Sequence, residues 1–382
     1  DMAQTLGTSH TIQTQTFEAL LREGGALPAV DMARGSSEDA VLLVYTSGTS
    51  GLPKGAVHTQ RNLCRNMQLA GTNAELIATD LIVTVLPLFH VGGLCIQTLP
   101  ALGVGACVSL HAKFDAGATL QCFANERPSL TLQVPATMRA LMEHPDWAST
   151  DLGSLRAVWA GSAVLPANLI EAFHTRGIPV CNVYGSTETG PFSISLPPMH
   201  ARSHAGSCGW PASEAVQVKL IDQTQGVGEI CIRGPNVAER YWPDLPLKDD
   251  EGWFHTGDLA RQDADGSYRV VGRAKDMLIS GGENIYPAEI ENLLVAQPGV
   301  VECAVLGMPD AKWGEVVAAC VVLESGADPA QMQKHLSHVL GSQLARYKLP
   351  RQWRFLQTLP KTALGKVQKA QLLADLSRSR ET

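Results

Sequence analysis

The chain has 382 residues, of which 45% are hydrophobic and 18% charged, and its formal net charge is −7 at pH 7. This length and composition can bury one large core and a smaller one. Phosphate backbones are held by clustered Lys and Arg, and the sequence has no such cluster, so it argues against a nucleic-acid-binding protein. We therefore expect a soluble protein of two domains whose partners are small molecules.

Strand-like apolar runs alternate with helical stretches in the first part of the chain. The helical pattern is clear over residues 166–177, where Leu169, Ile170 and Phe173 share a face. The predicted strands lie in residues 40–45, 81–88, 106–110, 129–135, 155–161 and 179–185. Such alternation is typical of a layered α/β domain. Residues 81–110 lack Asp, Glu, Lys and Arg, but Pro and Gly interrupt them, so we expect short core strands and turns rather than a membrane span.

The pattern changes twice after this region. From about residue 216 to 269, short apolar runs separated by Gly, Pro and Asp turns predict an antiparallel β subdomain. Beyond it, the sequence predicts helices in residues 287–297 and 328–344, strands in 300–308 and 315–324, and a last helix from about Val367. We therefore predict an α/β fold with a large layered N-terminal domain, its β subdomain, and a small C-terminal α+β domain. The predicted boundary separates residues 1–273 from residues 274–382.

The nine cysteines form no C-x-x-C pair. Most of them lie in apolar runs such as "VGACVSL" and "VVAACVVL", which are typical of buried free thiols. Free thiols persist in reducing compartments, so we expect a cytoplasmic protein.

The stretch "VYTSGTSGLPKG", from Val44 to Gly55, combines hydroxyl side chains, glycines and one lysine. Gly48 and Gly51 permit a tight turn, and Lys54 supplies a positive charge. The hydroxyl donors are Thr46, Ser47, Thr49 and Ser50. A Gly-rich turn after a strand can direct N–H groups and hydroxyls at an anion, so the pattern predicts a phosphate site. It matches neither a Walker A loop nor a G-x-G-x-x-G fingerprint, and an ordinary Ser/Thr-rich surface loop is the alternative.

The string "YTSGTSGLPKG" resembles the signature loop of the AMP-forming adenylating superfamily, which includes acyl-CoA synthetases, peptide-synthetase adenylation domains and luciferases. Further segments resemble the family's other motifs in the family's order: "AGSAVLP" (160–166), "VYGSTETG" (183–190), "WFHTGDLA" (253–260), "GSYRVVGRAKDMLISGGENIYPAEIE" (266–291) and "LPKTALGKVQKAQL" (359–372). The resemblance covers nearly the whole chain. It also implies that part of the family's usual N-terminal region is missing, so residues 1–273 are expected to form an incomplete AMP/ATP-binding domain.

The resemblance implies a role for each nucleotide-binding motif. Tyr184 would stack on adenine, Glu188 would hold Mg²⁺, Asp258 would accept the ribose hydroxyls and Arg273 would approach ribose and phosphate. Taken singly, "YGSTETG" could be a strand-to-turn junction with a solvated Glu, and Asp258 a turn residue. The implied ATP/AMP-binding set is Thr46, Ser47, Gly48, Thr49, Ser50, Gly51, Lys54, Gly161, Ser162, Ala163, Tyr184, Gly185, Thr187, Asp258 and Arg273.

The same resemblance implies the catalytic and CoA-binding residues. Lys366, Thr187 and His90 would be catalytic, and Lys275 would be the hinge between the domains, with the C-terminal domain mobile. A cation about 4 Å from a developing negative charge is worth roughly 4 kcal/mol at an effective dielectric near 20, or about a thousandfold in rate. CoA would be met by Gly281, Gly282, Lys348 and Arg351. The alternatives from the residues are a turn at Gly281 and Gly282, a basic strand edge at Lys348 and Arg351, and a hydrogen-bonded core histidine at His90.

The implied reaction has two steps, in which a carboxylate attacks the α-phosphorus of Mg-ATP and a thiolate then displaces AMP. In amino-acid-activating relatives an Asp stands in the window that "LPLFHVGGL" (Leu86 to Leu94) occupies here, and this window has no acid. The segments 160–163, 189–192 and 134–138 are also uncharged, which favours a fatty or aryl acid. The expected cofactors are ATP, Mg²⁺ and coenzyme A. A stand-alone enzyme that loads a carrier protein and a non-catalytic nucleotide-binding relative are the alternatives.

Overall fold

The computed structural model of the chain describes residues 35–46, 53–161, 165–361 and 367–378. The chain divides into two compact units, Asp1–Asp39 and Ala40–Thr382. In the first unit, residues 35–39 are described, and the Asp39 N–H donates to the Ser36 carbonyl at 3.1 Å in a turn. The helices and strands of the described residues all belong to the second unit.

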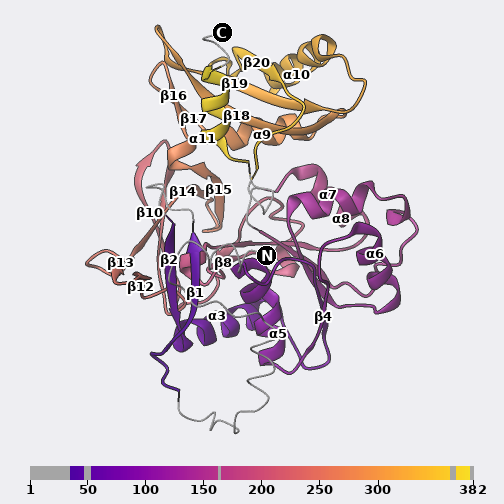
Figure 1. The fold of residues 1–382 in the computed structure, drawn as a ribbon, viewed down its shortest axis with the longest axis vertical. Helices are drawn as coiled ribbons and strands as arrows, with labels where there is room; N and C mark the ends of the chain where they lie inside the picture. Colours follow the sequence, from indigo (N-terminus) through magenta and orange to yellow (C-terminus); the bar gives the residue numbers. More distant parts are fainter. Residues whose placement is uncertain (1–34, 47–52, 162–164, 362–366, 379–382) are drawn as a thin grey trace, which may run out of the picture. The chain divides into compact units, whose positions relative to one another are not determined.

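A seven-stranded sheet with the strand order β4-β3-β5-β6-β7-β8-β9 forms the centre of the larger part of this unit. Strands β3 to β7 pair in parallel, and β8 and β9 continue the sheet antiparallel (Figure 1). The strands are β3 (Leu81–Thr84), β4 (Cys107–Leu110), β5 (Leu130–Gln133), β6 (Ala157–Ala160), β7 (Val180–Tyr184), β8 (Ile194–Ser195) and β9 (Trp210–Pro211). The parallel core confirms the predicted layered α/β fold.

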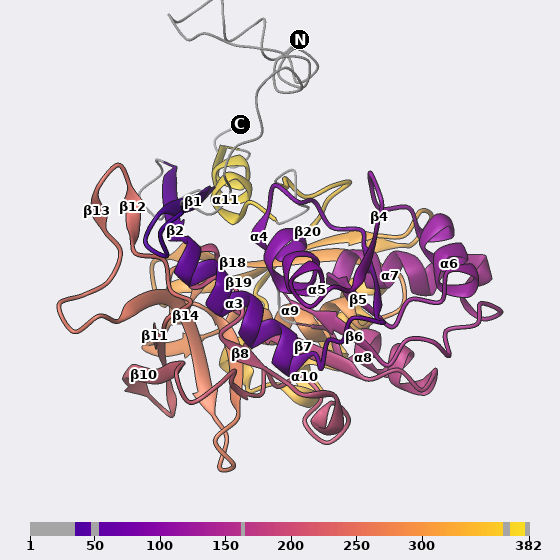
Figure 2. The same cartoon turned by 90° about the horizontal axis from the view of Figure 1, so that it is seen from below.

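Helices cover both faces of this sheet (Figures 1 and 2). One apolar cluster joins α3 and α5 to Leu130, Leu132 and Trp159, and the other joins α6, α7 and α8 to Val158 and Ala160. Strands buried on both faces are expected to be rich in apolar residues, and β6, with the sequence AVWA, is apolar throughout. The helices are α3 (Gln60–Asn73), α4 (Val91–Gly93), α5 (Leu99–Gly103), α6 (Ala116–Asn125), α7 (Pro135–Glu143), α8 (Ala167–Thr175), and the short helices η2 (Leu94–Thr98), η3 (Pro145–Trp147), η4 (Thr187–Thr189) and η5 (Pro198–His200).

The uncharged region 81–110 differs from its prediction in one respect. It begins and ends with the short strands β3 and β4, but α4, η2 and α5 stand between them where turns were expected. All nine cysteines are free thiols, yet Cys64 and Cys107 are exposed, so the prediction of burial is wrong for these two. Cys107 begins β4, which is an edge strand, and an edge has a neighbouring strand on one side only.

Residues 40–46 form a strand that does not belong to the parallel sheet. Strand β1 (Ala40–Thr46) pairs antiparallel with β2 (Lys54–Thr59), and β12 (Arg240–Trp242) and β13 (Leu245–Pro246) complete a separate four-stranded sheet. Alternate apolar side chains of β1 are exposed, namely Val41, Leu43 and Tyr45, with 50% exposure at Val41. The apolar pattern of this run therefore predicted the strand correctly but placed it in the wrong sheet.

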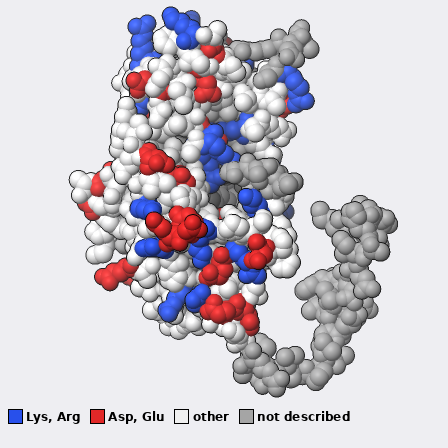
Figure 3. Space-filling model, turned by 90° about the vertical axis from the view of Figure 1, so that its left-hand side faces the viewer, with Lys and Arg blue, Asp and Glu red and all other residues white. Residues whose placement is uncertain are grey.

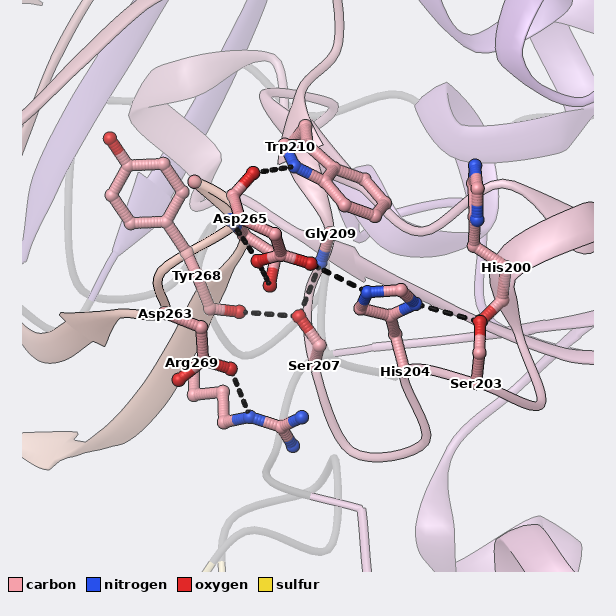
Figure 4. A network of polar contacts seen from close by, with 12 residues as sticks. His200, Ser203, His204, Ser207, Gly209, Trp210, Asp263, Asp265, Tyr268 and Arg269 are labelled. Atoms are coloured by element: carbon pink, nitrogen blue, oxygen red, sulfur yellow. Dashed lines mark hydrogen bonds and ion pairs between the residues drawn. The ribbon is translucent and has the colours of Figure 1, made fainter.

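The antiparallel β subdomain is present and has the strand order β10-β11-β14-β15. The strands are β10 (Gln217–Thr224), β11 (Val227–Arg233), β14 (Phe254–Gln262) and β15 (Tyr268–Arg273). Figure 4 shows how the β14–β15 hairpin is held at its turn: Asp265 Oδ2 lies 2.6 Å from His204 Nε2, and Arg269 Nε donates to Asp263 at 2.6 Å. These contacts lie at the turn of the hairpin, and the pair Asp258 and Arg273 lies further along its two strands.

A second mixed sheet, with the order β17-β16-β19-β18 and β20 parallel to β19, is formed by residues after Arg273. Its apolar clusters contain no described residue before Leu278. Its elements are η6 (Ala274–Asp276), β16 (Leu278–Ser280), β17 (Glu283–Ile285), α9 (Pro287–Val295), β18 (Val300–Asp310), β19 (Gly314–Leu323), α10 (Pro329–Gln343), η7 (Arg346–Lys348), β20 (Gln352–Phe355) and α11 (Lys369–Arg378). The α+β composition is as predicted, and the boundary at residue 273 stays a prediction.

On the face drawn in Figure 3, the basic and acidic side chains of the described residues are interspersed. Within the described parts of the chain, no helix has both the length and the apolar character needed to cross a bilayer.

Candidate active site

Three of the predicted nucleotide-binding side chains meet at Asp258. Asp258 on β14 and Arg273 on β15 are cross-strand partners, and Arg273 Nε donates to Asp258 Oδ1 at 2.6 Å. The Tyr184 hydroxyl, at the end of β7, donates to the other carboxylate oxygen at 2.9 Å. The strand register therefore brings together an acid, a base and an aromatic side chain from two different sheets.

Burial and charge shift the pKa values of Tyr184 and Arg273. Asp258 is 8% exposed and Tyr184 is 9% exposed. Burial, and next the charge of Asp258, raise the pKa of Tyr184 well above its ordinary value, so the phenol stays neutral and donates. Burial alone would lower the pKa of Arg273, but the charge of Asp258 raises it above its ordinary value. The side chain of Asp258 already accepts two hydrogen bonds, from Tyr184 and Arg273.

A second cluster forms around Glu188, on the short helix η4. Glu188 Oε1 accepts from the Tyr241 hydroxyl at 2.9 Å and lies 3.5 Å from Thr46 Oγ1, the donor predicted at the start of the phosphate loop. Lys54 Nζ lies 5.4 Å from the centre of the Tyr241 ring. The Glu188 backbone is also fixed, because its carbonyl accepts from the Ala238 N–H at 2.8 Å.

The backbone carbonyl of Thr187 is hydrogen-bonded to a buried histidine. His58 Nε2 lies 2.7 Å from the Thr187 carbonyl, so this nitrogen carries the proton and donates. Burial lowers the pKa of His58, which favours the neutral ring. The η4 turn that bears Thr187 and Glu188 is therefore anchored on β2, the strand that follows the phosphate loop.

The ends of the predicted phosphate loop are fixed by the β1–β2 hairpin. Thr46 and Lys54 are paired across the two strands. Thr46 Oγ1 lies 3.4 Å from the Lys54 carbonyl, so its single proton is shared between this oxygen and Glu188 Oε1. Among the described residues, the element that follows the loop is strand β2 and not a helix. Several predicted site residues lie outside the described residues: Ser47, Gly48, Thr49, Ser50, Gly51, Ser162, Ala163 and Lys366.

Two glycines of the predicted adenine segments are required by packing alone. A Cβ at Gly161 would lie 2.8 Å from the Val183 carbonyl oxygen, and a Cβ at Gly185 would overlap the carbonyl of Pro191. Both positions therefore need glycine for the approach of neighbouring backbone. Their contact with a nucleotide stays a prediction.

His90 is half-buried and caps a helix. The Gly92 N–H donates to His90 Nδ1 at 3.0 Å at the start of α4. A ring nitrogen that accepts from an N–H carries no proton itself, so the proton of the neutral ring is on Nε2. The capping role matches the structural alternative, and a catalytic role would have to use Nε2.

The residues predicted to bind CoA form two separate groups. Gly281 and Gly282 form the two-residue turn between β16 and β17, with φ of 62° and 87°, as a tight hairpin requires. A Cβ at Gly281 would lie 2.8 Å from the Trp313 ring, and the Arg351 guanidinium stacks on the same ring at 4.5 Å. Lys348 Nζ instead pairs with Glu289 at 2.7 Å. Gly281 and Arg351 therefore share Trp313, while the charge of Lys348 is compensated on α9.

The comparisons with known proteins agree with this geometry. A family model described as "AMP-binding enzyme" matches residues 4–242, and one described as "AMP-binding enzyme C-terminal domain" matches residues 289–366. An indoleacetate–CoA ligase of Aromatoleum aromaticum is 48% identical over 366 residues, which are 93% of this chain and 70% of the relative. The chain belongs to the AMP-binding enzyme family.

Other relatives of this AMP-binding enzyme support the same reaction type. A feruloyl-CoA synthase of an Amycolatopsis species is 42% identical over 88% of this chain and 70% of its own length. The solved O-succinylbenzoate CoA synthetase of Bacillus subtilis, in complex with ATP and magnesium, is 30% identical with a TM-score of 0.81, over 92% of this chain and 74% of its own. The chain is thus an AMP-forming acid–thiol ligase, with ATP, Mg²⁺ and CoA as its cofactors.

The residues of this AMP-binding enzyme suit a magnesium ion that takes most of its ligands from phosphate and water. Within the described residues, no group of three or more His, Cys, Asp or Glu side chains could hold a metal. Glu188 is a single carboxylate held at one oxygen by hydroxyls rather than by a cation. Mg²⁺ in nucleotide sites is bound by one or two carboxylates plus substrate phosphates, so Glu188 fits it.

Three side chains of these clusters were missed in the sequence. Tyr241 lies in "ERYWPDL" and His58 in "GAVHTQ", and neither segment has a spacing or composition that marks a site. Trp313 stands in the turn between two predicted strands, where a large aromatic side chain is unusual, and that signal could have identified it.

Proposed function

We propose that this ligase converts a carboxylic acid with an apolar tail, fatty or aryl, to its acyl-CoA through an acyl-adenylate, with release of AMP and pyrophosphate. The observation that carries the proposal is the approach of Thr46 to Glu188, at 3.5 Å, across 142 positions of sequence. That contact joins the predicted phosphate loop to the predicted metal ligand. A nucleoside triphosphate and its bound cation need a phosphate-binding loop and a metal ligand close to each other.

The residues would divide the work as follows. Asp258 accepts the ribose hydroxyls, and Tyr184 and Arg273 keep its carboxylate oriented for them. Lys54 and the loop hydroxyls bind the β- and γ-phosphates, and Lys366 and Thr187 stabilise the charge that develops at the α-phosphate. Glu188 would hold Mg²⁺, which neutralises phosphate charge when bound. Catalysis of the first step is then mainly positioning and electrostatic stabilisation.

The apolar tail is inferred from the lack of charge in the segments 86–94, 134–138, 160–163 and 189–192. A charged or zwitterionic acid would need a partner there, because a buried unpaired charge is costly. The relatives named for indoleacetate and feruloyl substrates support an aryl acid. His90 would contact the acid carboxylate or the thiol through Nε2–H.

The second step is proposed to use free CoA and a turn of the C-terminal region. Arg351 and the Trp313 ring could meet the CoA nucleotide beside Gly281 and Gly282. Lys348 could join them only by exchanging Glu289 for a phosphate. Lys275 is exposed within the single turn η6, a short segment of the kind that absorbs hinge rotation between half-reactions.

A pyrophosphate-release assay over fatty acids, benzoates, cinnamates and arylacetates, with and without CoA, tests the proposal. The expected result is release that depends on acid and Mg-ATP, with an acyl-CoA product only when CoA is present. Product formed on an added carrier protein but never on CoA would favour the carrier-loading alternative. ATP binding without pyrophosphate exchange for any acid would overturn the proposal.

A further inference from the structure

Gln97 is a buried amide for which the described residues offer no partner. It lies in η2, is 2% exposed, and neither its Oε1 nor its Nε2 makes a hydrogen bond. Nearly all buried polar side chains in proteins are hydrogen-bonded, and leaving a donor or acceptor unpaired is destabilising. A side chain with both amide atoms unpaired therefore calls for an explanation.

Two buried polar side chains that contact η2 or belong to it, Thr98 and Asn66, do have partners. Thr98 Oγ1 donates to the Gly93 carbonyl at 2.6 Å and lies 2.9 Å from Thr84 Oγ1. Asn66 Nδ2 donates to the Cys95 carbonyl at 2.7 Å. Burial raises the pKa of the Cys95 thiol to about 12, as expected of a dry, apolar environment. Among the buried side chains of the described residues, Gln97 is the only amide with both of its polar atoms unpaired.

The position of η2 connects Gln97 to the proposed acid pocket. Helix η2 follows directly on the segment 86–94, the first uncharged stretch assigned to that pocket. Asn66 accepts from the Phe192 N–H at 3.0 Å as well as donating to Cys95, so it joins η2 to the stretch 189–192, a second part of that pocket. Ile96, the neighbour of Gln97, belongs to the same apolar cluster as Phe192. The π-helical form of η2 is itself rare and is frequent at functional sites.

We propose that Gln97 determines acid specificity by hydrogen-bonding a polar group on the ring of an aryl acid. The inference rests on the proposed function and narrows its substrate class. A fatty tail would leave both amide atoms unpaired. A ring N–H can donate to Oε1, and a phenolic hydroxyl can donate to Oε1 or accept from Nε2. The favoured substrates are therefore aryl acids that carry a ring N–H or hydroxyl.

Matched acids and the substitution Gln97→Met test this assignment. Indole-3-acetate and naphthalene-1-acetate are similar in size, but only the first has a ring N–H, and 4-hydroxycinnamate and cinnamate form a second pair. In the wild type, kcat/KM is expected to favour the hydrogen-bonding member of each pair by about tenfold or more. In Gln97→Met this preference should disappear, chiefly through loss of activity on the hydrogen-bonding member.

Controls separate specificity from folding. Methionine removes the unpaired amide without a large change of volume, so the Tm of Gln97→Met should equal or exceed that of the wild type, and Gln97→Leu is the second variant if it does not. Ser213 Oγ is another buried atom without a partner, outside every proposed pocket segment, and Ser213→Ala should leave both preferences unchanged. Equal changes for both members of each pair in Gln97→Met overturn the inference, because they indicate a structural amide. Absence of pyrophosphate release with every acid would instead overturn the proposed function, and this inference with it.

Discussion

Asp258 and Glu188 are both carboxylates assigned to the nucleotide, but their surroundings differ. Asp258 is buried, pairs with the Arg273 guanidinium at 2.6 Å and accepts from Tyr184. Glu188 is half-buried and receives hydroxyl donors, from Tyr241 and Thr46, at a single oxygen. The charge of Asp258 is compensated within the protein, whereas the hydroxyls around Glu188 orient its carboxylate without neutralising it.

This difference separates a carboxylate that supports the fold from one that is available to a cation. A buried charge whose partner is removed destabilises the protein, so a change at Asp258 should affect both stability and binding. A carboxylate without a counter-charge contributes little to stability and keeps its charge for a ligand. A substitution at Glu188 should therefore change the reaction rate with little loss of stability, whereas a substitution at Asp258 should change both nucleotide binding and stability.

The largest effect is expected at Lys366, which tests the chemistry that both carboxylates would serve. Lys366→Ala should slow adenylation about a thousandfold, because the lysine is predicted to stabilise the charge that develops at the α-phosphate. Thioester formation from supplied acyl-adenylate should be largely retained. Single-turnover assays of each half-reaction measure this division, and equal loss in both steps would falsify it.

The next largest effect is expected for Glu188→Gln. The amide keeps the shape of the side chain but removes its charge, so adenylation should slow about a hundredfold and need more Mg²⁺ for half-maximal rate. The free energy of unfolding should stay within about 0.5 kcal/mol of the wild type. The matched control is Glu214→Gln, at an exposed acid. An unchanged Mg²⁺ dependence would show that Glu188 is not the metal ligand.

Asp258→Asn should, in contrast, lower stability as well as weaken ATP binding. It leaves Arg273, which is 33% exposed, without its counter-charge, and we expect a loss of roughly 1–2 kcal/mol in unfolding free energy after allowance for solvent screening. The KM for ATP should rise at least tenfold, because a charged acceptor for the ribose is lost. Denaturant titration and initial rates measure the two effects. Asp265→Asn, which changes the ion pair with His204 in Figure 4, is the control and should leave the KM for ATP unchanged.

Tyr241→Phe tests whether the Tyr241 hydroxyl orients the carboxylate of Glu188. It removes a 2.9 Å hydrogen bond to the carboxylate, worth about 1 kcal/mol, so adenylation should fall about fivefold with little change in stability. Tyr268→Phe removes a buried hydroxyl that contacts the Val218 carbonyl and not Glu188, and it should leave the rate unchanged. If the two substitutions had the same effect on rate, the orientation of Glu188 by Tyr241 would be refuted.

The features of the fold and the site that could be predicted are those that a linear sequence pattern encodes. Asp258 and Glu188 were assigned from their motifs, and the parallel strands β3 to β7 from their apolar runs. The pairing of Asp258 with Arg273 depends on strand register, which a linear pattern does not encode. Tyr241 reaches Glu188 because β12 joins the β2 sheet, a contact between segments far apart in the sequence. The misplaced strand β1 has the same cause, since an apolar run predicts a strand but not its partner.

A third carboxylate, that of Asp80, is paired outside every predicted site, so it shows what pairing contributes to stability alone. Asp80 is buried beside β3, receives 2.8 and 2.7 Å hydrogen bonds from Arg156 and Ser129, and belongs to no predicted site. Burial alone would raise its pKa, but hydrogen bonds from Ser129, the Ile77 N–H and Arg156 lower it below the ordinary value near 3.8. The folded state therefore binds fewer protons than the unfolded state near pH 4, and this stabilisation is present above that pH and is lost as the pH falls toward the lowered pKa.

Asp80→Asn should accordingly have the smallest kinetic effect, with KM and kcat within about twofold of the wild type. It should lower the unfolding free energy by roughly 1 kcal/mol at pH 7 and flatten the decline of stability between pH 5 and pH 3. Urea titrations across that range measure both. Because this variant loses a paired carboxylate outside the site, its profile shows how much of the Asp258→Asn effect comes from pairing alone. A large rise in the KM for ATP in Asp80→Asn would mean that the Asp258 result reports a general loss of structure rather than a lost ribose contact.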